Sequence, residues 1–185
     1  MDKSAYSYLR FLSGDENAFA DIVKESRTGL TYFINSIVRN VDAAEELTED
    51  VFVKLYLKRP KDRKNCSFKT WLYTIARNMA LDYLRKTKRE ALLSADVSED
   101  SHRQEDLLEE KYIAEETKRA LEKALKSINP DYAAALRLTF YEGFSSEETA
   151  HILKKSVKST YDLIYRAKKS LKEQLIKDGF TYEIR

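Results

Sequence analysis

Residues 68–89 read Phe68-Lys-Thr-Trp-Leu-Tyr-Thr-Ile-Ala-Arg-Asn-Met-Ala-Leu-Asp-Tyr-Leu-Arg-Lys-Thr-Lys-Arg89, and this stretch decides the kind of fold. Apolar side chains recur at the spacing of a helix that packs one stripe against a core: Phe68, Leu72, Ile75, Met79 and Tyr83. The opposite side carries hydrogen-bonding groups and cations, with one aromatic at its edge: Thr70, Thr74, Arg77, Asn78, Arg85 and Trp71. The sequence therefore predicts a long amphipathic helix that ends in the basic run Arg85, Lys86, Lys88 and Arg89.

The polar side of this helix has two interpretations. Cations bind phosphates, while an aromatic ring and an amide suit bases that have left the stack. A charged helix face is also commonly only solvated, and a lone Trp at the boundary of a face is more often part of the core. The residues of this stretch alone leave both interpretations open.

The composition favours helices over sheets. The chain has 185 residues, enough for one or two small domains, and 35% of them are charged, with only four Gly and two Pro. We therefore predict an all-α fold. The net charge of +2 is nearly balanced, but acids gather in residues 96–110 and bases in residues 154–172. This asymmetry suits a protein that contacts nucleic acid at some places and a protein surface at others.

The sequence lacks the patterns of catalysis, metal binding and membrane insertion. Cys66, His102 and His151 lie far apart without ligand spacing, so no catalytic residue, metal site or cofactor is predicted. A single cysteine forms no internal disulfide, which fits a reducing cytoplasm. No apolar run reaches the ~18 residues of a membrane span, and the N-terminus lacks the apolar segment of a signal peptide. We expect a cytoplasmic protein without membrane insertion.

Three helices are expected before residue 58. Residues 4–12 form a short helix, and Asp15 caps a helix over residues 16–27, which Gly29 loosens before residues 30–38 resume it. Asp42 caps the third helix, which reaches residue 57. Four acids on its outer side fall within roughly 100° of one another, with Val53 in line with them: Asp42, Glu46, Glu49 and Asp50. Such a face either docks a basic protein partner or is simply solvated.

Two segments break the helical pattern. Residues 59–67 contain a Pro and several bases and are predicted to form a loop. Over residues 90–115 the apolar pattern thins, and a polar, acidic composition cannot bury enough surface to order itself. This segment is predicted to be a flexible acidic linker between two small helical domains, residues 1–89 and 116–185.

The second domain contains a helix-turn-helix pattern. After a helix over residues 116–128, the pair Asn129-Pro130 begins another helix whose buried residues are expected to be Ala134, Leu138 and Tyr141. After a turn at residues 142–144, Ser145 or Ser146 caps a helix to Leu153, and a second turn precedes the helix from Val157. Two short helices joined by three or four residues, the second of them basic, are typical of DNA-binding helix-turn-helix motifs.

In this order, the segments resemble regions two and four of the sigma-70 family of RNA polymerase sigma factors, and the short length resembles its extracytoplasmic-function (ECF) group. Region two reads roughly Phe-x-x-Trp-Leu-x-x-Ile-Ala-x-Asn-x-Ala-x-Asp-x-x-Arg, and the matching residues are Phe68, Trp71, Leu72, Ile75, Ala76, Asn78, Ala80, Asp82 and Arg85. The acidic segment Asp42-Ala-Ala-Glu-Glu-Leu-Thr-Glu-Asp-Val-Phe52 is similar to the segment that precedes it in the family. Region four is similar over Gly143-Phe-Ser-x-Glu-Glu-x-Ala-x-x-Leu153, then at Val157, Thr160 and Arg166-Ala-Lys168.

The resemblance implies a promoter-recognition subunit of bacterial RNA polymerase and not an enzyme. Region two would dock on the coiled coil of the largest polymerase subunit through Asp42, Glu46, Glu49, Asp50 and Val53. It would recognise and melt the minus-ten element through Lys61, Arg63, Lys64, Trp71, Thr74, Arg77, Asn78, Arg85 and Lys86, with Asn78 lining a pocket for a flipped base. The basic loop lacks the Phe and Gly common in the family, so the base that it accepts does not follow from the resemblance.

Region four would contact the polymerase flap and enter the major groove of the duplex minus-thirty-five element. The residues available to that DNA are Lys155, Lys158, Ser159, Tyr161, Asp162, Tyr165, Arg166, Lys168 and Lys169. This chain has Lys158-Ser-Thr-Tyr-Asp-Leu163 where the family usually has Gly-Thr-Val-x-Ser-Arg. Leu163 cannot read guanine as Arg does, and Asp162 either accepts a hydrogen bond from a cytosine amine or repels phosphate.

Two other functions compete with this interpretation. A stand-alone helix-turn-helix regulator would bind duplex operators as a dimer, but it leaves the acidic helix and the aromatic-basic helix unexplained. An enzyme that used the pairs Glu45/Glu46 or Glu147/Glu148 would need side chains that converge, whereas adjacent residues of a helix point apart. The family also implies an anti-sigma factor as a further partner.

Overall fold

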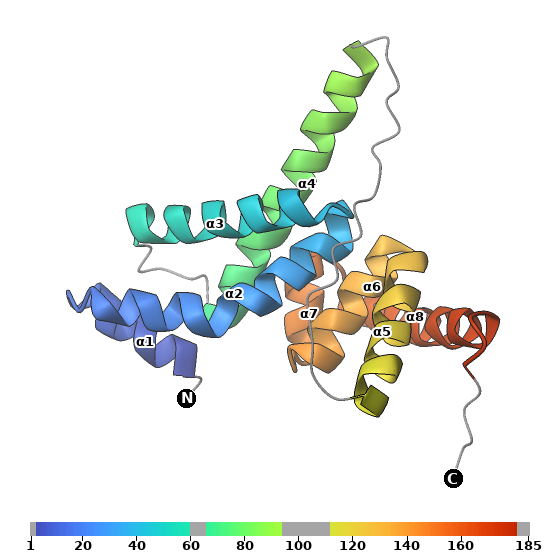
Figure 1. Ribbon diagram of the computed structural model, residues 1–185. Helices are drawn as coiled ribbons and strands as arrows, with labels where there is room; N and C mark the ends of the chain where they lie inside the picture. Colours follow the sequence, from blue (N-terminus) through green and yellow to red (C-terminus); the bar gives the residue numbers. More distant parts are fainter. Residues whose placement is uncertain (1–2, 60–65, 94–111, 181–185) are drawn as a thin grey trace.

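The computed structural model describes residues 3–59, 66–93 and 112–180, and within them all regular structure is helical (Figure 1). The α-helices are α1 (Lys3–Leu12), α2 (Asn17–Val38), α3 (Val41–Lys58), α4 (Phe68–Leu93), α5 (Tyr112–Ser127), α6 (Pro130–Leu136), α7 (Ser146–Leu153) and α8 (Val157–Lys177). A π-helical turn, η1 (Arg137–Tyr141), extends α6. The predicted all-α fold is confirmed. Most of the predicted linker lies outside the described residues, although α4 runs four residues beyond the expected boundary.

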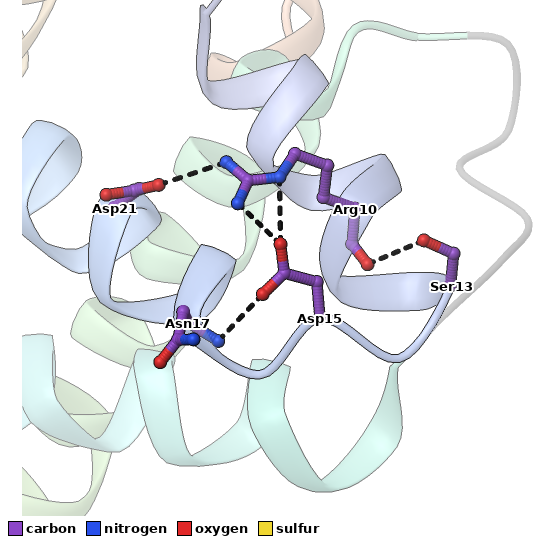
Figure 2. A network of polar contacts seen from close by, with 5 residues as sticks. All are labelled: Arg10, Ser13, Asp15, Asn17 and Asp21. Atoms are coloured by element: carbon purple, nitrogen blue, oxygen red, sulfur yellow. Dashed lines mark hydrogen bonds and ion pairs between the residues drawn. The ribbon is translucent and has the colours of Figure 1, made fainter.

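The turn between α1 and α2 is held by polar contacts (Figure 2). Arg10 donates from Nε to Asp15 Oδ2 at 2.9 Å, and this contact lowers the pKa of the Asp15 carboxyl. Asp15 Oδ1 accepts the backbone N–H of Asn17 at 3.1 Å, so Asp15 supports the start of α2, whereas the side chain of the boundary residue Glu16 makes no capping hydrogen bond. The expectation that Gly29 loosens this helix was wrong, because α2 continues without a break to Val38.

The sequence predicted that Asp42 caps α3, and this prediction was wrong. The cap is Asn40. The Asn40 side chain accepts the backbone N–H of Ala43 at 2.9 Å, whereas Asp42 lies in the first turn. An amide oxygen placed one residue before the helix satisfies an N–H that has no partner within the helix. An acid in the first turn contributes only through the helix dipole.

We therefore expect Asn40→Ala to lower the free energy of unfolding by about 1 kcal/mol. Asp42→Ala is the matched control, because it removes a neighbouring polar side chain of the same helix end and should cost about 0.3 kcal/mol. Urea unfolding followed by circular dichroism measures both values. A larger loss in Asp42→Ala than in Asn40→Ala would show that the cap has been assigned to the wrong residue.

The predicted apolar stripe of α4 packs into the core of the first half. Phe68 and Leu72 are fully buried, and the Phe68 ring stacks on Tyr8 of α1 with centroids 4.3 Å apart. Trp71 is half-buried against the same core, 6.4 Å from the Tyr8 ring and 6.1 Å from the Phe68 ring. This packing favours the core interpretation of Trp71. Thr70, which the pattern placed on the polar side, is only 1% exposed.

The second half forms the expected helix-turn-helix from α7 and α8. Ser145 caps α7 in a reciprocal arrangement: its side chain accepts from the Glu148 N–H, and the Glu148 carboxylate accepts from the Ser145 N–H. Ser156 caps α8 by accepting from Ser159 N at 3.1 Å. The expectation that Tyr141 is buried was wrong, since the π-helical turn rotates it outward and leaves it 48% exposed.

One hydrophobic core runs through both halves. It joins residues of α1–α4 to Ala134, Leu138, Phe144, Ile152 and Leu163 of the second half. The halves meet where α2 packs on α6 and α4 packs on α7. In Figure 1, the C-terminal end of α4 projects beyond this packed body. The elements that carry the two predicted DNA-binding regions are therefore in direct contact.

Candidate protein- and DNA-binding surfaces

The acidic face of α3 is open to solvent. Asp42, Glu46, Glu49 and Asp50 are all exposed, and Val53 is 54% exposed in line with them. Glu49 differs from the others because its Oε1 accepts from Nη2 of Arg27 on α2 at 3.0 Å. The structure thus brings together all five residues that the sequence assigned to a protein partner.

An apolar groove adjoins this face, between α2 and the C-terminal part of α3. It has a volume of about 370 Å³, and Arg27 and Glu49 are among its lining residues. Its apolar lining residues are Phe19, Val23, Phe52, Val53, Tyr56 and Leu57. The sequence had identified only Val53 as an exposed contact. Tyr56 and Leu57 could have indicated this groove from the sequence, because both side chains are large and apolar but lie outside the buried stripe of α3.

The candidate minus-ten residues of α4 divide into two groups. Trp71, Thr74, Arg77 and Asn78 are half-buried in the N-terminal part of the helix. Burial lowers the pKa of the Arg77 guanidinium, and the Asp131 carboxylate of α6 opposes that effect. Arg85 and Lys86 are exposed in the projecting part, beside Asp82 at 3.1 Å and Glu90 at 4.0 Å respectively. Lys61, Arg63 and Lys64 lie outside the described residues.

The candidate recognition helix α8 presents a polar and aromatic face. Tyr161, Asp162, Tyr165 and Arg166 are exposed, and the last three line a shallow hollow. Tyr165 is 72% exposed, which is unusual for so large a ring. Arg166 Nε donates to the backbone carbonyl of Asp162 at 3.2 Å.

The other candidate residues of the second half differ in exposure. Lys158 is exposed, whereas Ser159 is half-buried beside the cap of α8. The three remaining lysines are exposed, and each ammonium has a neighbour. Nζ of Lys155 lies 3.9 Å from a carboxylate oxygen of Asp131, and Nζ of Lys169 lies 4.0 Å from one of Glu173. Nζ of Lys168 lies 4.7 Å from the centroid of the Phe140 ring. Leu163 is only 5% exposed, so its position in this chain faces the core and not a ligand.

The structure also reveals polar residues that join the two halves and that the sequence did not single out. They are Arg39 of α2, Lys69, Thr70 and Tyr73 of α4, Glu142 of the turn before α7, and Glu148 of α7. Their partners lie about 70 residues or more away in sequence, so no local pattern marks them.

Within the described ranges, no three His, Cys, Asp or Glu side chains gather in a way that would hold a metal ion. In the same ranges, no helix is both long enough and apolar enough to span a membrane.

Two family models match this chain, in the same order as the two halves of the structure. The model for Sigma-70 region 2 matches residues 22–90, and the model for Sigma-70, region 4 matches residues 118–171. Similar curated proteins include the ECF RNA polymerase sigma factor SigW of Bacillus subtilis, 28% identical over 88% of this chain and 91% of that protein. Another is the RNA polymerase sigma-H factor of Pseudomonas aeruginosa, 26% identical over 90% of each chain.

Solved structures show the same arrangement of helices. The sigma factor RpoE of Bartonella quintana, solved with the anti-sigma factor NepR, is 27% identical, with a TM-score of 0.69 over 85% of this chain and 96% of that one. CnrH, solved with the cytosolic domain of CnrY, has a TM-score of 0.64 over 96% of this chain and 99% of that one. At 21% identity, the likeness to CnrH bears on the fold alone.

Proposed function

Since this chain belongs to the ECF group of the sigma-70 family, we propose that it binds core RNA polymerase and directs promoter recognition, DNA melting and transcription initiation. The observation that carries this proposal is that both family regions occur in one chain, in order, over residues 22–90 and 118–171. Sigma factors are in general initiation factors and not enzymes. In this proposal, residues 1–89 bind core polymerase and the minus-ten element, and residues 116–185 bind the minus-thirty-five element. Residues 90–115 connect these two domains.

Core polymerase docks on the acidic face of α3 in this proposal, through Asp42, Glu46, Glu49, Asp50 and Val53. Exposed carboxylates around an exposed apolar side chain favour a partner that is basic and carries an apolar contact of its own. The adjoining groove between α2 and α3 supplies more apolar surface for the same partner, a coiled coil of the largest subunit. The flap of the polymerase binds the second half.

In this proposal, the N-terminal part of α4 and the basic loop before it melt the promoter. A protein melts a duplex when it binds the opened strand better than the closed one, and stacking on an aromatic contributes about 1–3 kcal/mol per base. Asn78 lines the base pocket, with Trp71 and Thr74 beside it. Arg77, Arg85, Lys86 and the loop residues Lys61, Arg63 and Lys64 hold the phosphates.

In this proposal, the exposed face of α8 recognises the duplex minus-thirty-five element. Asp162 accepts from a cytosine amine and Arg166 donates to guanine, so one helix face reads both members of a G·C pair. The exposed rings of Tyr161 and Tyr165 suit the methyl groups of neighbouring thymines. Lys158 and Ser159 contact the DNA at the start of the helix, and Lys155, Lys168 and Lys169 add contacts to phosphate.

We expect Asp162→Asn to change which base pair this helix prefers. An asparagine amide pairs best with adenine, so selectivity for cytosine at one position should fall by about 5-fold to 100-fold. Transcription from a library of randomised minus-thirty-five elements, read by sequencing, measures the change. Asp178→Asn, which removes an acid at the far end of the same helix, is the control. Unchanged selectivity in Asp162→Asn would exclude Asp162 from base readout.

An anti-sigma factor is a further partner in this proposal, because RpoE of Bartonella quintana, which has this fold, has been solved with the anti-sigma factor NepR. In this proposal the protein acts in the cytoplasm, since bacterial core polymerase and its DNA are found there.

The decisive test is run-off transcription with purified core polymerase and the intact chain. Transcripts that start at defined promoters only when the chain is added would support the proposal. Without binding to core, but with salt-sensitive binding of the chain to duplex DNA, the stand-alone helix-turn-helix regulator would take its place.

A further inference from the structure

Arg59 caps the C-terminal end of α3, where the basic loop of residues 59–67 begins. Its backbone has a φ of 38° and a ψ of 54°, the left-handed conformation, and its N–H donates to the Leu55 carbonyl at 3.0 Å. Glycine adopts this conformation freely, whereas any other residue needs contacts that hold it there. The conformation turns the chain away from the helix axis, so Arg59 sets the direction in which the chain leaves α3.

The Arg59 side chain ties this turn to α1 and α2. Its Nη2 donates to Oε1 of Glu16, at the start of α2, at 2.7 Å. The guanidinium carbon lies 4.4 Å from the ring centroid of Phe11, which is fully buried in α1, and 5.1 Å from that of Tyr56. A planar guanidinium can make both kinds of contact at once, because its face stacks on a ring while its N–H groups point outward to a carboxylate.

The turn that carries Glu16 is itself held in place (Figure 2). Arg10 of α1 donates from Nε to Asp15, the residue before Glu16, at 2.9 Å, and from Nη1 to Asp21 at 3.4 Å. Asp15 also accepts the backbone N–H of Asn17, the residue after Glu16. The Glu16 carboxylate is therefore presented from a turn in which both neighbouring residues are fixed.

The other end of the basic loop is fixed as well. Ser67 Oγ accepts the backbone N–H of Thr70 at 3.1 Å, and the Ser67 carbonyl accepts the N–H of Trp71 at 3.0 Å. A loop with both ends fixed has fewer conformations available, so its side chains lose less entropy when they bind a ligand.

We propose that Arg59 and Glu16 are positioning residues for the basic loop: they fix its first residue, and the loop thereby discriminates among the bases of the minus-ten element. This inference rests on the proposed function for the role of the loop. Arg59 is not a DNA contact, because its guanidinium is already paired with Glu16 and stacked on Phe11. Release of Arg59 leaves the loop's other charges unchanged but removes its fixed start, and a less ordered loop adapts to more than one base.

Two variants remove this contact from opposite sides. Arg59→Gly keeps the left-handed conformation, since glycine is the residue most common at such a helix end, but deletes the side chain. Glu16→Ala removes the carboxylate and leaves Arg59 and the loop unchanged. Lys58→Ala is the matched control, because it removes an exposed basic side chain from the residue just before Arg59. None of these three residues belongs to the proposed polymerase or DNA contacts.

The first measurement is the base preference at each position of the minus-ten element. Core polymerase with the full chain transcribes promoters that are randomised over this element, and the transcribed templates are sequenced. Arg59→Gly and Glu16→Ala should lower the preference for the best base over the worst about 3-fold to 10-fold at one or more positions. The preference should stay as in wild type for Lys58→Ala, and the preference at the minus-thirty-five element should stay unchanged in all three variants.

The second measurement separates positioning from direct contact with DNA. A side chain that binds a phosphate contributes about 0.9 to the slope of log affinity against log salt concentration. In a salt titration of promoter binding, Arg59→Gly should therefore leave the slope as in wild type.

Unchanged base preference in both variants, or a slope reduced by about 0.9 in Arg59→Gly, would overturn this role. Circular dichroism and binding to core polymerase check that each variant is folded and docked, and Glu16→Ala keeps the test valid if Arg59→Gly does not fold. A wild-type chain that supports no transcription would overturn the proposed function and this role with it. Wild-type transcription with unchanged preference in both variants would overturn the role of Arg59 and Glu16 alone.

Discussion

Replacing Glu46 and Asp50 of α3 together by lysine is expected to weaken binding to core RNA polymerase about 100-fold or more. Charge pairs across a protein interface contribute about 1.5 kcal/mol or more each, so two reversals remove roughly 3 kcal/mol. Both carboxylates are exposed on the same face, and we expect the free energy of unfolding to change by about 0.5 kcal/mol or less. Glu49 is left intact because it bonds to Arg27, and its reversal would also disturb the packing of α2 on α3.

Fluorescence titration of labelled chain with core polymerase measures this loss. The control is Asp82→Lys with Glu90→Lys, which makes the same change in net charge at exposed positions of α4, away from the proposed polymerase contacts. The apolar groove gives a second check, because Leu57→Ala removes an exposed side chain beside the same face. Equal weakening by the control pair would mean that net charge, and not this face, governs the affinity.

Asn78→Ala is expected to reduce open-complex formation about 10-fold to 100-fold at a promoter that the wild type uses. The amide is half-buried on α4. In the proposed function it pairs with a base that has left the stack, and loss of such base contacts costs about 1–3 kcal/mol. Binding to core polymerase should not change, because Asn78 lies on α4 and the proposed docking face lies on α3.

Permanganate footprinting of the minus-ten region measures opening directly. On a template that is already mismatched over this region, the defect should shrink, since less of the melting has to be driven by capture of the base. Asn17→Ala, at an exposed amide of α2, is the matched control. A defect of the same size on the duplex and mismatched templates would argue that Asn78 acts after melting.

The helices and their ends were largely predictable from the sequence, because the signals are local. The apolar stripe of α4 begins with the buried Phe68 and Leu72 as expected, and the Asn129-Pro130 start of α6 is confirmed, with Asn129 accepting from Asp131 N at 2.8 Å. A cap is satisfied within three residues, and a stripe repeats every turn. The prediction that Asp42 caps α3 was wrong because Asn40, two residues earlier, is also a residue type that caps helices well.

The order of the two family regions was also readable from residues alone, since the spaced motifs around Asn78 and Ala150 need no knowledge of the fold. The acidic face was predicted as a set for the same reason: its members lie on one helix, and their spacing places them together.

The tertiary structure decided what each polar side chain faces. Thr70 has the spacing of a DNA contact but is buried against Glu148, and Leu163 has the place of a base reader but packs in the core. Trp71, left open by its position at the edge of a face, packs towards Tyr8. The groove of α2 and α3 and the ion pair of Lys69 with Glu142 arise between segments far apart in the chain. A local pattern fixes only the direction of a side chain about its own helix. What lies in that direction depends on which distant segment packs there, and that is set by the shared core of the two halves.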